Sequence, residues 1–419
     1  MMTKLLTTRQ SLLLLWGGQF MTMASLEMSG PFWPVYLREL SPLFSGQQLL
    51  FWSGAVYAAP MATAILSAPL WGWLGDRYGH KLMVLRAVLA LAATQIMIAY
   101  SQTVESIFLW RLVQGGCAGV IAASMAYAVM LGTPANRGQI LTSLQSSTAA
   151  GSLIGPIIGG VIITQLDYQS LFLSASICCL VITLLFALFL NSGDQVATRD
   201  SQKSCGNSSM QENSPAGFPW LITALICAAI TITQIAKMMP QSYFALFVEQ
   251  IGGDQPILLG LIFSTTGLAI LISTPLWGLL IDRISQTASL GLLIFLSLAC
   301  AALLWLHQYA TDLIRLALMR FAWGLCLGAF LPMLFNLLSQ FAGTSGRIIG
   351  FGNSFSKVGN LGGYLGGALA ASLLGFTGAF QAIGLLYLLL AACLLALIFF
   401  HQNHAASTSV NNIERFWDV

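Results

Sequence analysis

The stretch SAPLWGWLGDR, from Ser67 to Arg77, returns 206 residues later as STPLWGLLIDR, from Ser273 to Arg283. Two further correspondences have nearly the same spacing. RLVQGGCAG, which begins at Arg111, matches RFAWGLCLG at an offset of 209 residues, and a series of glycines matches a second series at an offset of 208. These glycines are Gly151, Gly155 and Gly159 in one half and Gly359, Gly363 and Gly367 in the other. The chain is therefore expected to contain two homologous halves in parallel.

The composition points to a lipid bilayer as the solvent of most of the surface. Only 7% of the 419 residues are charged and 57% are hydrophobic, whereas a soluble domain carries about 25% charged residues. The net charge of +3 and the lack of basic runs argue against a nucleic-acid partner. The eight cysteines show neither a zinc-binding spacing nor a disulfide framework. No metal site and no cofactor are therefore expected.

Twelve segments are long and apolar enough to cross a membrane as helices, which takes about 20 mostly apolar residues. They are residues 11–37, 49–74, 82–101, 107–131, 139–165, 170–190, 219–249, 257–281, 289–308, 313–339, 347–375 and 379–401. The predicted fold is an all-α membrane protein with two pseudo-symmetric six-helix bundles, at residues 1–190 and 219–401. A polar linker at 191–218 joins the bundles, and a tail follows at 402–419.

The distribution of Lys and Arg predicts the orientation, because cytoplasmic loops carry an excess of both. With both termini in the cytoplasm, the inner segments hold Lys4, Arg9, Arg77, Lys81, Arg86, Arg137, Arg199, Lys203, Arg283, Arg347 and Arg415. The outer loops hold Arg38, and Arg315 lies near an outer helix end. We therefore expect a multi-pass membrane protein whose termini, linker and tail are cytoplasmic.

The loop after the second predicted span reads GWLGDRYGHK, at residues 72–81. Its glycines allow helix ends to approach closely, and its aspartate can meet a helix N-terminus. The loop resembles the signature loop of the major facilitator superfamily, which latches the two halves together in the outward-facing state. His80 stands where the family usually has Arg, and the second copy lacks the later Gly and Lys. The resemblance implies a cytoplasmic latch formed by Gly72, Asp76, Arg77, Gly79, Lys81, Asp282 and Arg283.

The fifth predicted span carries Gly151, Gly155, Pro156 and Gly159. Small residues at every fourth position permit close helix packing, and the proline can kink the helix. The series also resembles the motif of the superfamily's antiporters, which are exporters. The second half has Tyr364 in place of the proline. Together with PFWPVYLREL at residues 31–40, the motif makes the chain similar to the twelve-helix drug/proton antiporter branch, which includes bacterial multidrug and siderophore exporters. The resemblance implies a location in the bacterial inner (plasma) membrane.

Two charged residues of the first half are candidates for proton coupling. Glu27 is the carboxylate placed deepest within a predicted span, and Pro31 and Pro34 share its face. A low dielectric favours the neutral form of a carboxyl group, so Glu27 can exchange a proton. Arg111 resembles an arginine that the family associates with proton coupling. The alternatives are a packing carboxylate paired with a base and a structural arginine bonded to carbonyl groups.

Polar side chains on predicted spans face a cavity or another helix rather than lipid. In the family, helices 1, 4, 7 and 10 line the cavity. The candidate substrate residues are Gln114, Gln234, Lys237, Gln241, Arg320, Lys357 and Asn360. Lys237 lies within one residue of the position that the repeat relates to Glu27. These bases suit an anionic substrate, unless Lys237 pairs with Glu27 and Arg320 is structural.

The sequence thus predicts a secondary active transporter that couples proton movement to efflux of a small organic solute or drug by alternating access. The alternative is dedicated export or import of an anionic metabolite such as a carboxylate siderophore. An enzyme is not expected, because the zinc-protease, nucleophile-elbow and phosphate-loop motifs are all missing from the sequence. The expected partners are a small-molecule substrate, protons and the lipid bilayer, and the chain is expected to be a monomer.

Overall fold

The computed structural model describes residues 8–117, 119–132, 136–190, 220–281, 283–342 and 346–417. Helices make up almost all of these residues, and the described chain contains no strand, which confirms the all-α prediction. Contacts divide the protein into two compact units. Unit 1 comprises Met1–Asn213 and Tyr243–Gly267, and unit 2 comprises Ser214–Ser242 and Leu268–Val419. The division of the chain at residues 190, 218 and 401 stays a prediction from the sequence. The linker at 191–218 lies outside the described residues.

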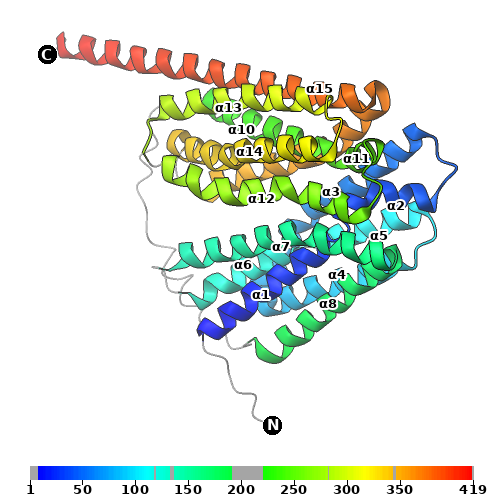
Figure 1. Ribbon diagram of the computed structural model, residues 1–419. Coiled ribbons are helices and arrows are strands. Elements are labelled where there is room, and N and C mark those ends of the chain that lie inside the picture. The colour runs from blue at the N-terminus through cyan, green and yellow to red at the C-terminus, as the bar shows by residue number, and fades with distance from the viewer. Residues whose placement is uncertain are drawn as a thin grey trace. The chain divides into compact units, whose positions relative to one another are not determined.

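Unit 1 contains the first helices of the chain, several of which run side by side in Figure 1. They are α1 (Thr8–Glu27), η1 (Gly30–Phe32), α2 (Trp33–Leu40), α3 (Gly46–Tyr78), α4 (His80–Ala99), α5 (Val104–Gly116), α6 (Val120–Leu131), α7 (Arg137–Gln165), α8 (Tyr168–Phe189) and α11 (Phe244–Gln250). The first part of α12 (Pro256–Ile281) completes the unit.

Unit 2 contains the remaining helices and the second part of α12. They are α10 (Trp220–Met238), η2 (Met239–Ser242), α13 (Gln286–His307), α14 (Leu313–Ala342) and α15 (Gly346–Trp417). α15 packs against both α10 and α13. It includes the two predicted spans 347–375 and 379–401, between which Gly375 adopts a φ of 69° and a ψ of 178° that no helix contains.

Ten helices of the described chain are long and apolar enough to cross a membrane. The difference from the twelve predicted spans has two causes. The last two spans form one helical run on either side of Gly375, and the first span is divided into α1, η1 and α2. Polar residues such as Gln19 and Glu27 also make α1 less apolar than the other spans.

Three of the predicted spans are interrupted, and a proline or a glycine lies at each interruption. Pro31 lies in the first turn of η1 and Pro34 in the first turn of α2, where the N–H group that a proline lacks has no partner in the helix. Pro240 lies in η2, at the end of α10. The predicted span 107–131 is divided into α5 and α6, and Gly119 before α6 has a φ of 119° that favours glycine.

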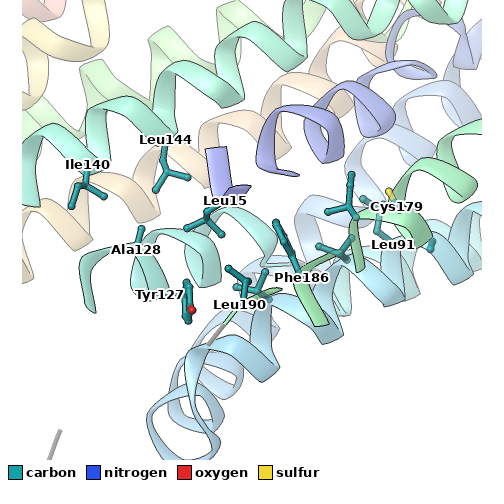
Figure 2. Packing of buried hydrophobic residues seen from close by; sticks show 13 residues of the cluster. Leu15, Leu91, Tyr127, Ala128, Ile140, Leu144, Cys179, Phe186 and Leu190 are labelled. Atoms are coloured by element: carbon teal, nitrogen blue, oxygen red, sulfur yellow. The ribbon is translucent and has the colours of Figure 1, made fainter. Parts of the chain in front are cut away.

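A cluster of buried apolar side chains holds α1, α4, α6, α7 and α8 together in unit 1. Figure 2 shows Leu15, Leu91, Tyr127, Ala128, Ile140, Leu144, Cys179, Phe186 and Leu190 within this cluster. Phe186 is 1% exposed, and its ring fills the space in front of Gly18, where a Cβ atom would come within 2.2 Å of the ring. Truncating such an aromatic residue costs about 3–5 kcal/mol, so Phe186 is a main determinant of this packing.

Candidate substrate and proton-coupling site

Glu27 is the last residue of α1, at the point where the chain enters the short turn η1. Its carboxyl oxygen Oε2 lies 2.8 Å from the position that a Cβ atom would take at Gly30. Gly155 of α7 faces the other side, and a Cβ atom there would lie 2.9 Å from Glu27 Cβ. The missing side chain at Gly30 therefore leaves space for the half-buried carboxylate, and the missing side chain at Gly155 leaves space for the Cβ atom and backbone of Glu27.

Arg111 connects three elements around the break between α1 and α2. Its Nε donates a hydrogen bond to the Val56 carbonyl oxygen of α3 at 3.1 Å, and Nη1 donates to Gln114 Oε1 at 2.7 Å. The guanidinium carbon lies 4.9 Å from the centroid of the Trp33 ring in α2, within the range of a cation–π interaction. Arg111 is 7% exposed. The Tyr57 hydroxyl of α3 donates to the Gly30 carbonyl oxygen, so α3 also holds the turn that follows Glu27.

The glycines of the antiporter-like motif allow α7 to approach the backbone of α1. Cβ atoms at Gly151, Gly155 and Gly159 would come within 2.0–2.6 Å of the carbonyl oxygens of Phe20, Ala24 and Met28. In unit 2, Gly359, Gly363 and Gly367 of α15 face the carbonyl oxygens of Thr231, Ile235 and Met239 of α10 in the same way. In both halves the repeated glycines thus allow two helices to pack with their backbones in contact.

These contacts also define which residues of α1 and α10 correspond. The paired carbonyl groups differ by 211 residues, from Ala24 to Ile235 and from Met28 to Met239. On this register the counterpart of Glu27 is Met238, and Lys237 precedes it by one residue. One residue is about 100° of rotation around a helix, so Lys237 and Glu27 lie on different faces of their helices relative to the packed glycines.

Each unit contains a buried glutamine that donates a hydrogen bond to a hydroxyl group, and the two hydroxyl groups occupy matching positions of the repeat. Gln234 Nε2 of α10 donates to Ser356 Oγ at 3.0 Å and to Asn360 Oδ1 at 2.9 Å. Gln19 Nε2 of α1 donates to Thr148 Oγ1 at 2.6 Å, and Thr148 is the counterpart of Ser356 at the offset of 208 residues. Both Oε1 atoms are buried, with no hydrogen-bond partner in the described part of the chain. The sequence prediction missed Gln19, although a glutamine within an apolar span was a detectable signal.

The remaining candidates of unit 2 lie in different environments. Arg320 is 5% exposed, and its guanidinium carbon lies 5.1 Å from the centroid of the Trp323 ring. Lys237 and Gln241 are half-buried on α10 and η2, whereas Lys357 is exposed on α15. The structure thus brings Gln234 and Asn360 together and places Arg320 with Trp323.

The structure also buries a histidine at the end of a predicted membrane span. His307 closes α13 and is fully buried against the ring of Phe380. Its Nδ1 lies 2.7 Å from the Leu303 carbonyl oxygen, which can only accept, so Nδ1 carries a proton and donates this hydrogen bond. A single His at the end of an apolar segment gives no signal of such burial in the sequence.

The predicted latch residues of the first half surround the turn between α3 and α4. Gly79 occupies this turn with a φ of 93°, which favours glycine. Lys81 Nζ donates to the carbonyl oxygens of Ala187 and Leu190, and it thereby caps the C-terminus of α8. Asp76 is exposed and 3.9 Å from His80. Gly72 and Arg77 are also exposed, as is Arg283, whereas Asp282 lies outside the described residues.

The described chain holds no cluster of three or more potential metal ligands. Comparison with known proteins identifies the family. The model of the Major Facilitator Superfamily matches residues 15–360 and 226–417. The chain is 32% identical to the staphyloferrin B transporter of Staphylococcus aureus, covering 87% of both chains. It is 30% identical to multidrug resistance protein MdtG of Serratia proteamaculans, covering 92% of this chain and 93% of the relative. It is also 27% identical to the multi-drug resistance efflux pump PmrA of Streptococcus pneumoniae, covering 90% and 93%.

Solved structures show the same fold at low sequence identity. The xylose transporter of E. coli in its inward-open conformation has a TM-score of 0.67 at 15% identity, with 92% of this chain and 95% of that chain covered. A human organic anion transporter has a TM-score of 0.64 at 17% identity, with 92% and 99% covered. The family match, the membrane helices and the glycine packing repeated in both halves agree that this chain belongs to the major facilitator superfamily and is a multi-pass membrane transporter.

Proposed function

We propose that this transporter exports a small organic solute in exchange for protons, and that Glu27 carries the proton. The supporting observation is the position of Glu27 at the end of α1, where Gly30 lies against its carboxylate and Gly155 lies against its Cβ atom. A carboxyl group at a break in a membrane helix combines an ionisable side chain with backbone that is free of regular helical bonding. Relatives named as multidrug resistance and efflux proteins support the outward direction.

Protonation of Glu27 removes a negative charge from the break between α1 and α2. The turn η1 is held by Tyr57 through the Gly30 carbonyl group, and α2 is held by Arg111 through the ring of Trp33. We infer that a change of charge at Glu27 alters the angle between α1 and α2, which biases the transporter between its inward-open and outward-open states. In this proposal Arg111 positions the break and does not carry the proton.

The proposed topology places both termini in the cytoplasm of a bacterium, on the basis of the inner excess of Lys and Arg. In this orientation the turn at Gly79 lies on the cytoplasmic side. Asp76 and Arg77 project from that turn as exposed side chains and are proposed to latch the cytoplasmic ends in the outward-open state.

A second candidate function is dedicated transport of a carboxylate-rich anion. It is favoured by the 32% identity to the staphyloferrin B transporter and by the basic residues Lys237 and Arg320 of the second half. Because Gln234 keeps a buried, unbonded amide oxygen in the described structure, a ligand with hydroxyl or amide donors would also suit this region. We expect such a ligand to be recognised mainly by the second half.

One experiment decides between these functions. A strain without the gene is compared with its parent in iron-rich and iron-poor medium, and the cells are assayed for ethidium and, by mass spectrometry, for carboxylate chelators. Retention of ethidium and other unrelated lipophilic cations supports multidrug export. Retention of one chelator under iron starvation supports the dedicated exporter. We call the compound that the deletion strain accumulates the retained compound.

The proton-coupling proposal is tested with Glu27→Gln, because glutamine keeps the shape of the side chain but cannot ionise. We expect export of the retained compound to slow and to lose its dependence on pH. Glu105→Gln, at an exposed carboxylate in the first turn of α5, is the matched control and should leave both unchanged. Export by Glu27→Gln at the normal rate, with the normal pH dependence, would refute the assignment.

A further inference from the structure

Helices α7 and α12 interlock through two copies of the same short pattern. Residues 156–160 of α7 read PIIGG and residues 256–260 of α12 read PILLG. A Cβ atom at Gly160 would lie 2.7 Å from the Pro256 carbonyl oxygen, and one at Gly260 would lie 2.3 Å from the Pro156 carbonyl oxygen. The backbone of each proline therefore packs directly against the glycine of the other helix, and neither glycine position has space for a side chain.

The same two helices continue to pack beyond this interlock. Ser264 Oγ of α12 donates to the Leu153 carbonyl oxygen of α7 at 2.8 Å, and Ser264 is only 5% exposed. The two helices pack antiparallel, because the contacts move back along α7 as they move forward along α12. They join Gly160 with Pro256, Pro156 with Gly260, and Leu153 with Ser264. The first part of α12 is thus seated along α7 with its backbone in direct contact.

A bidentate ion pair closes the end of this packed region. Both guanidinium nitrogens Nη1 and Nη2 of Arg38, in α2, lie 2.8 Å from the two carboxylate oxygens of Glu249, in α11. The Glu249 side chain is 17% exposed and that of Arg38 is 49% exposed. α11 contacts α2 and η1, and only residues 251–255 separate α11 from α12. Arg38 and the interlock therefore hold the same short segment, Tyr243–Gly267.

This segment belongs to the second sequence repeat, although its contacts assign it to unit 1. On the proposed topology, Arg38, Glu249, Gly160 and Pro256 all lie near the outer surface. We propose that the Arg38–Glu249 ion pair and the Gly160–Gly260 interlock form an outer seal, which joins the outer ends of the two sequence halves and separates when the transporter opens outward. The proposal rests on the proposed topology and on alternating access, and it does not depend on Glu27 or on the identity of the substrate.

The seal has a consequence for accessibility that can be measured directly. Ser264 lies within the seal, so a cysteine at this position is shielded while the seal is closed and reachable from outside when it opens. The experiment uses Ser264→Cys in the full chain, expressed in whole cells that are treated with a membrane-impermeant maleimide. The native chain, with its eight cysteines, gives the background labelling.

Arg38→Glu and Glu249→Arg are each added to Ser264→Cys, and so is the double exchange. We expect each single change to raise the labelling rate about two- to fivefold, as loss of a partly exposed ion pair predicts. The double exchange restores an ion pair of opposite polarity and should return the rate toward that of Ser264→Cys alone. Arg315→Glu is the matched control, because Arg315 forms an exposed pair with Asp312 on a single local segment; it should not change labelling.

The seal is refuted if both single changes label at the parental rate, or if the double exchange labels as fast as the single changes. Arg38→Gln removes the charge without reversing it, and it should give a smaller increase in the same direction if Arg38→Glu fails to reach the membrane. Absence of external labelling in every variant would refute the outer location of Ser264. Failure of Glu27→Gln to affect export, with the labelling pattern intact, would remove the proton assignment and leave the seal standing.

Discussion

Gly155 lies directly against Glu27, so that a Cβ atom at residue 155 would be only 2.9 Å from Glu27 Cβ and 2.6 Å from the Ala24 carbonyl oxygen. The antiporter-like motif of α7 and the candidate proton carrier of α1 are therefore in contact. The motif determines how close α7 comes to the end of α1, and through this distance it determines the surroundings of the carboxylate.

We predict that Gly155→Ala impairs both stability and export. The added methyl group cannot fit without moving α1, and overpacking of this kind costs about 1–3 kcal/mol. The thermal unfolding midpoint of the purified protein and the export rate of the retained compound should both fall. Gly366→Ala is the control, because a Cβ atom at that glycine of α15 would meet nothing within 4 Å. Equal behaviour of the two variants would contradict the packing role of Gly155.

Arg111→Lys tests whether Arg111 positions the break between α1 and α2. Lysine keeps the positive charge but lacks the planar group that bonds Val56 and Gln114 and covers the ring of Trp33. Loss of hydrogen bonds to a charged group costs about 1.5–3 kcal/mol, and the unfolding midpoint should fall accordingly. Export should slow while its pH dependence keeps its shape. A changed pH profile would instead assign Arg111 to proton transfer, and Arg9→Lys, at an exposed site, is the control.

We predict that the stability of the protein depends on pH through Glu39, which lies next to Arg38 of the outer seal. Burial raises the pKa of Glu39 above its usual 4.5, Arg38 lowers it, and Glu249 raises it. The folded protein therefore binds this proton more tightly than the unfolded chain. The resulting stability is fully present below pH 4.5 and is lost as the pH rises through the raised pKa of Glu39.

Glu39→Gln mimics the protonated form and should remove this dependence. Between pH 4.5 and 7 the unfolding midpoint of the parent should fall relative to that of the variant, because ionised Glu39 also competes with Glu249 for Arg38. A parallel pH dependence of the two proteins would contradict the assignment. Glu105→Gln, at an exposed carboxylate of α5, should follow the parent.

Two residues of the predicted latch are expected to have separable effects. Lys81→Ala removes the donor that caps α8, and such a cap contributes about 0.3–1 kcal/mol, so stability should fall. Asp76 is exposed, and Asp76→Asn should leave the unfolding midpoint unchanged while it slows export. If Asp76→Asn exports normally, Asp76 is not part of a latch, whatever Lys81→Ala does to stability.

The sequence predicted the features that repeat with a period. Hydrophobic runs gave the membrane helices, and the glycine spacing of four residues predicted the close packing of α7 that Gly151, Gly155 and Gly159 display. The repeat also placed Lys237 within one residue of the counterpart of Glu27, which the packing identifies as Met238. These features depend on local spacing, which the sequence states directly.

Partners that are distant in the sequence were not predictable in this way. Arg38 and Glu249 are 211 residues apart, and nothing in the residues around either of them specifies the other. The PILLG pattern of α12 was equally uninformative alone, because a small residue allows a close approach without identifying the helix that approaches. The division of the span 107–131 into α5 and α6 was missed because hydropathy does not distinguish a continuous helix from two helices in line.

The last prediction concerns the buried glutamine of α10, for which the packing register supplies its own template. Gln234 and Met23 are counterparts, since Gly359 faces Gln234 as Gly151 faces Met23. Gln234→Met gives the second half the residue of the first, with a similar volume but without the amide that bonds Ser356 and Asn360. Leaving these groups without a donor should destabilise the protein by about 1–3 kcal/mol. If the free Oε1 atom also receives a hydrogen bond from substrate, the KM for the retained compound should rise as well. Met23→Leu is the control. If it raises the KM as well, the packing of residues 23 and 234 against Gly151 and Gly359, and not the amide, determines substrate affinity.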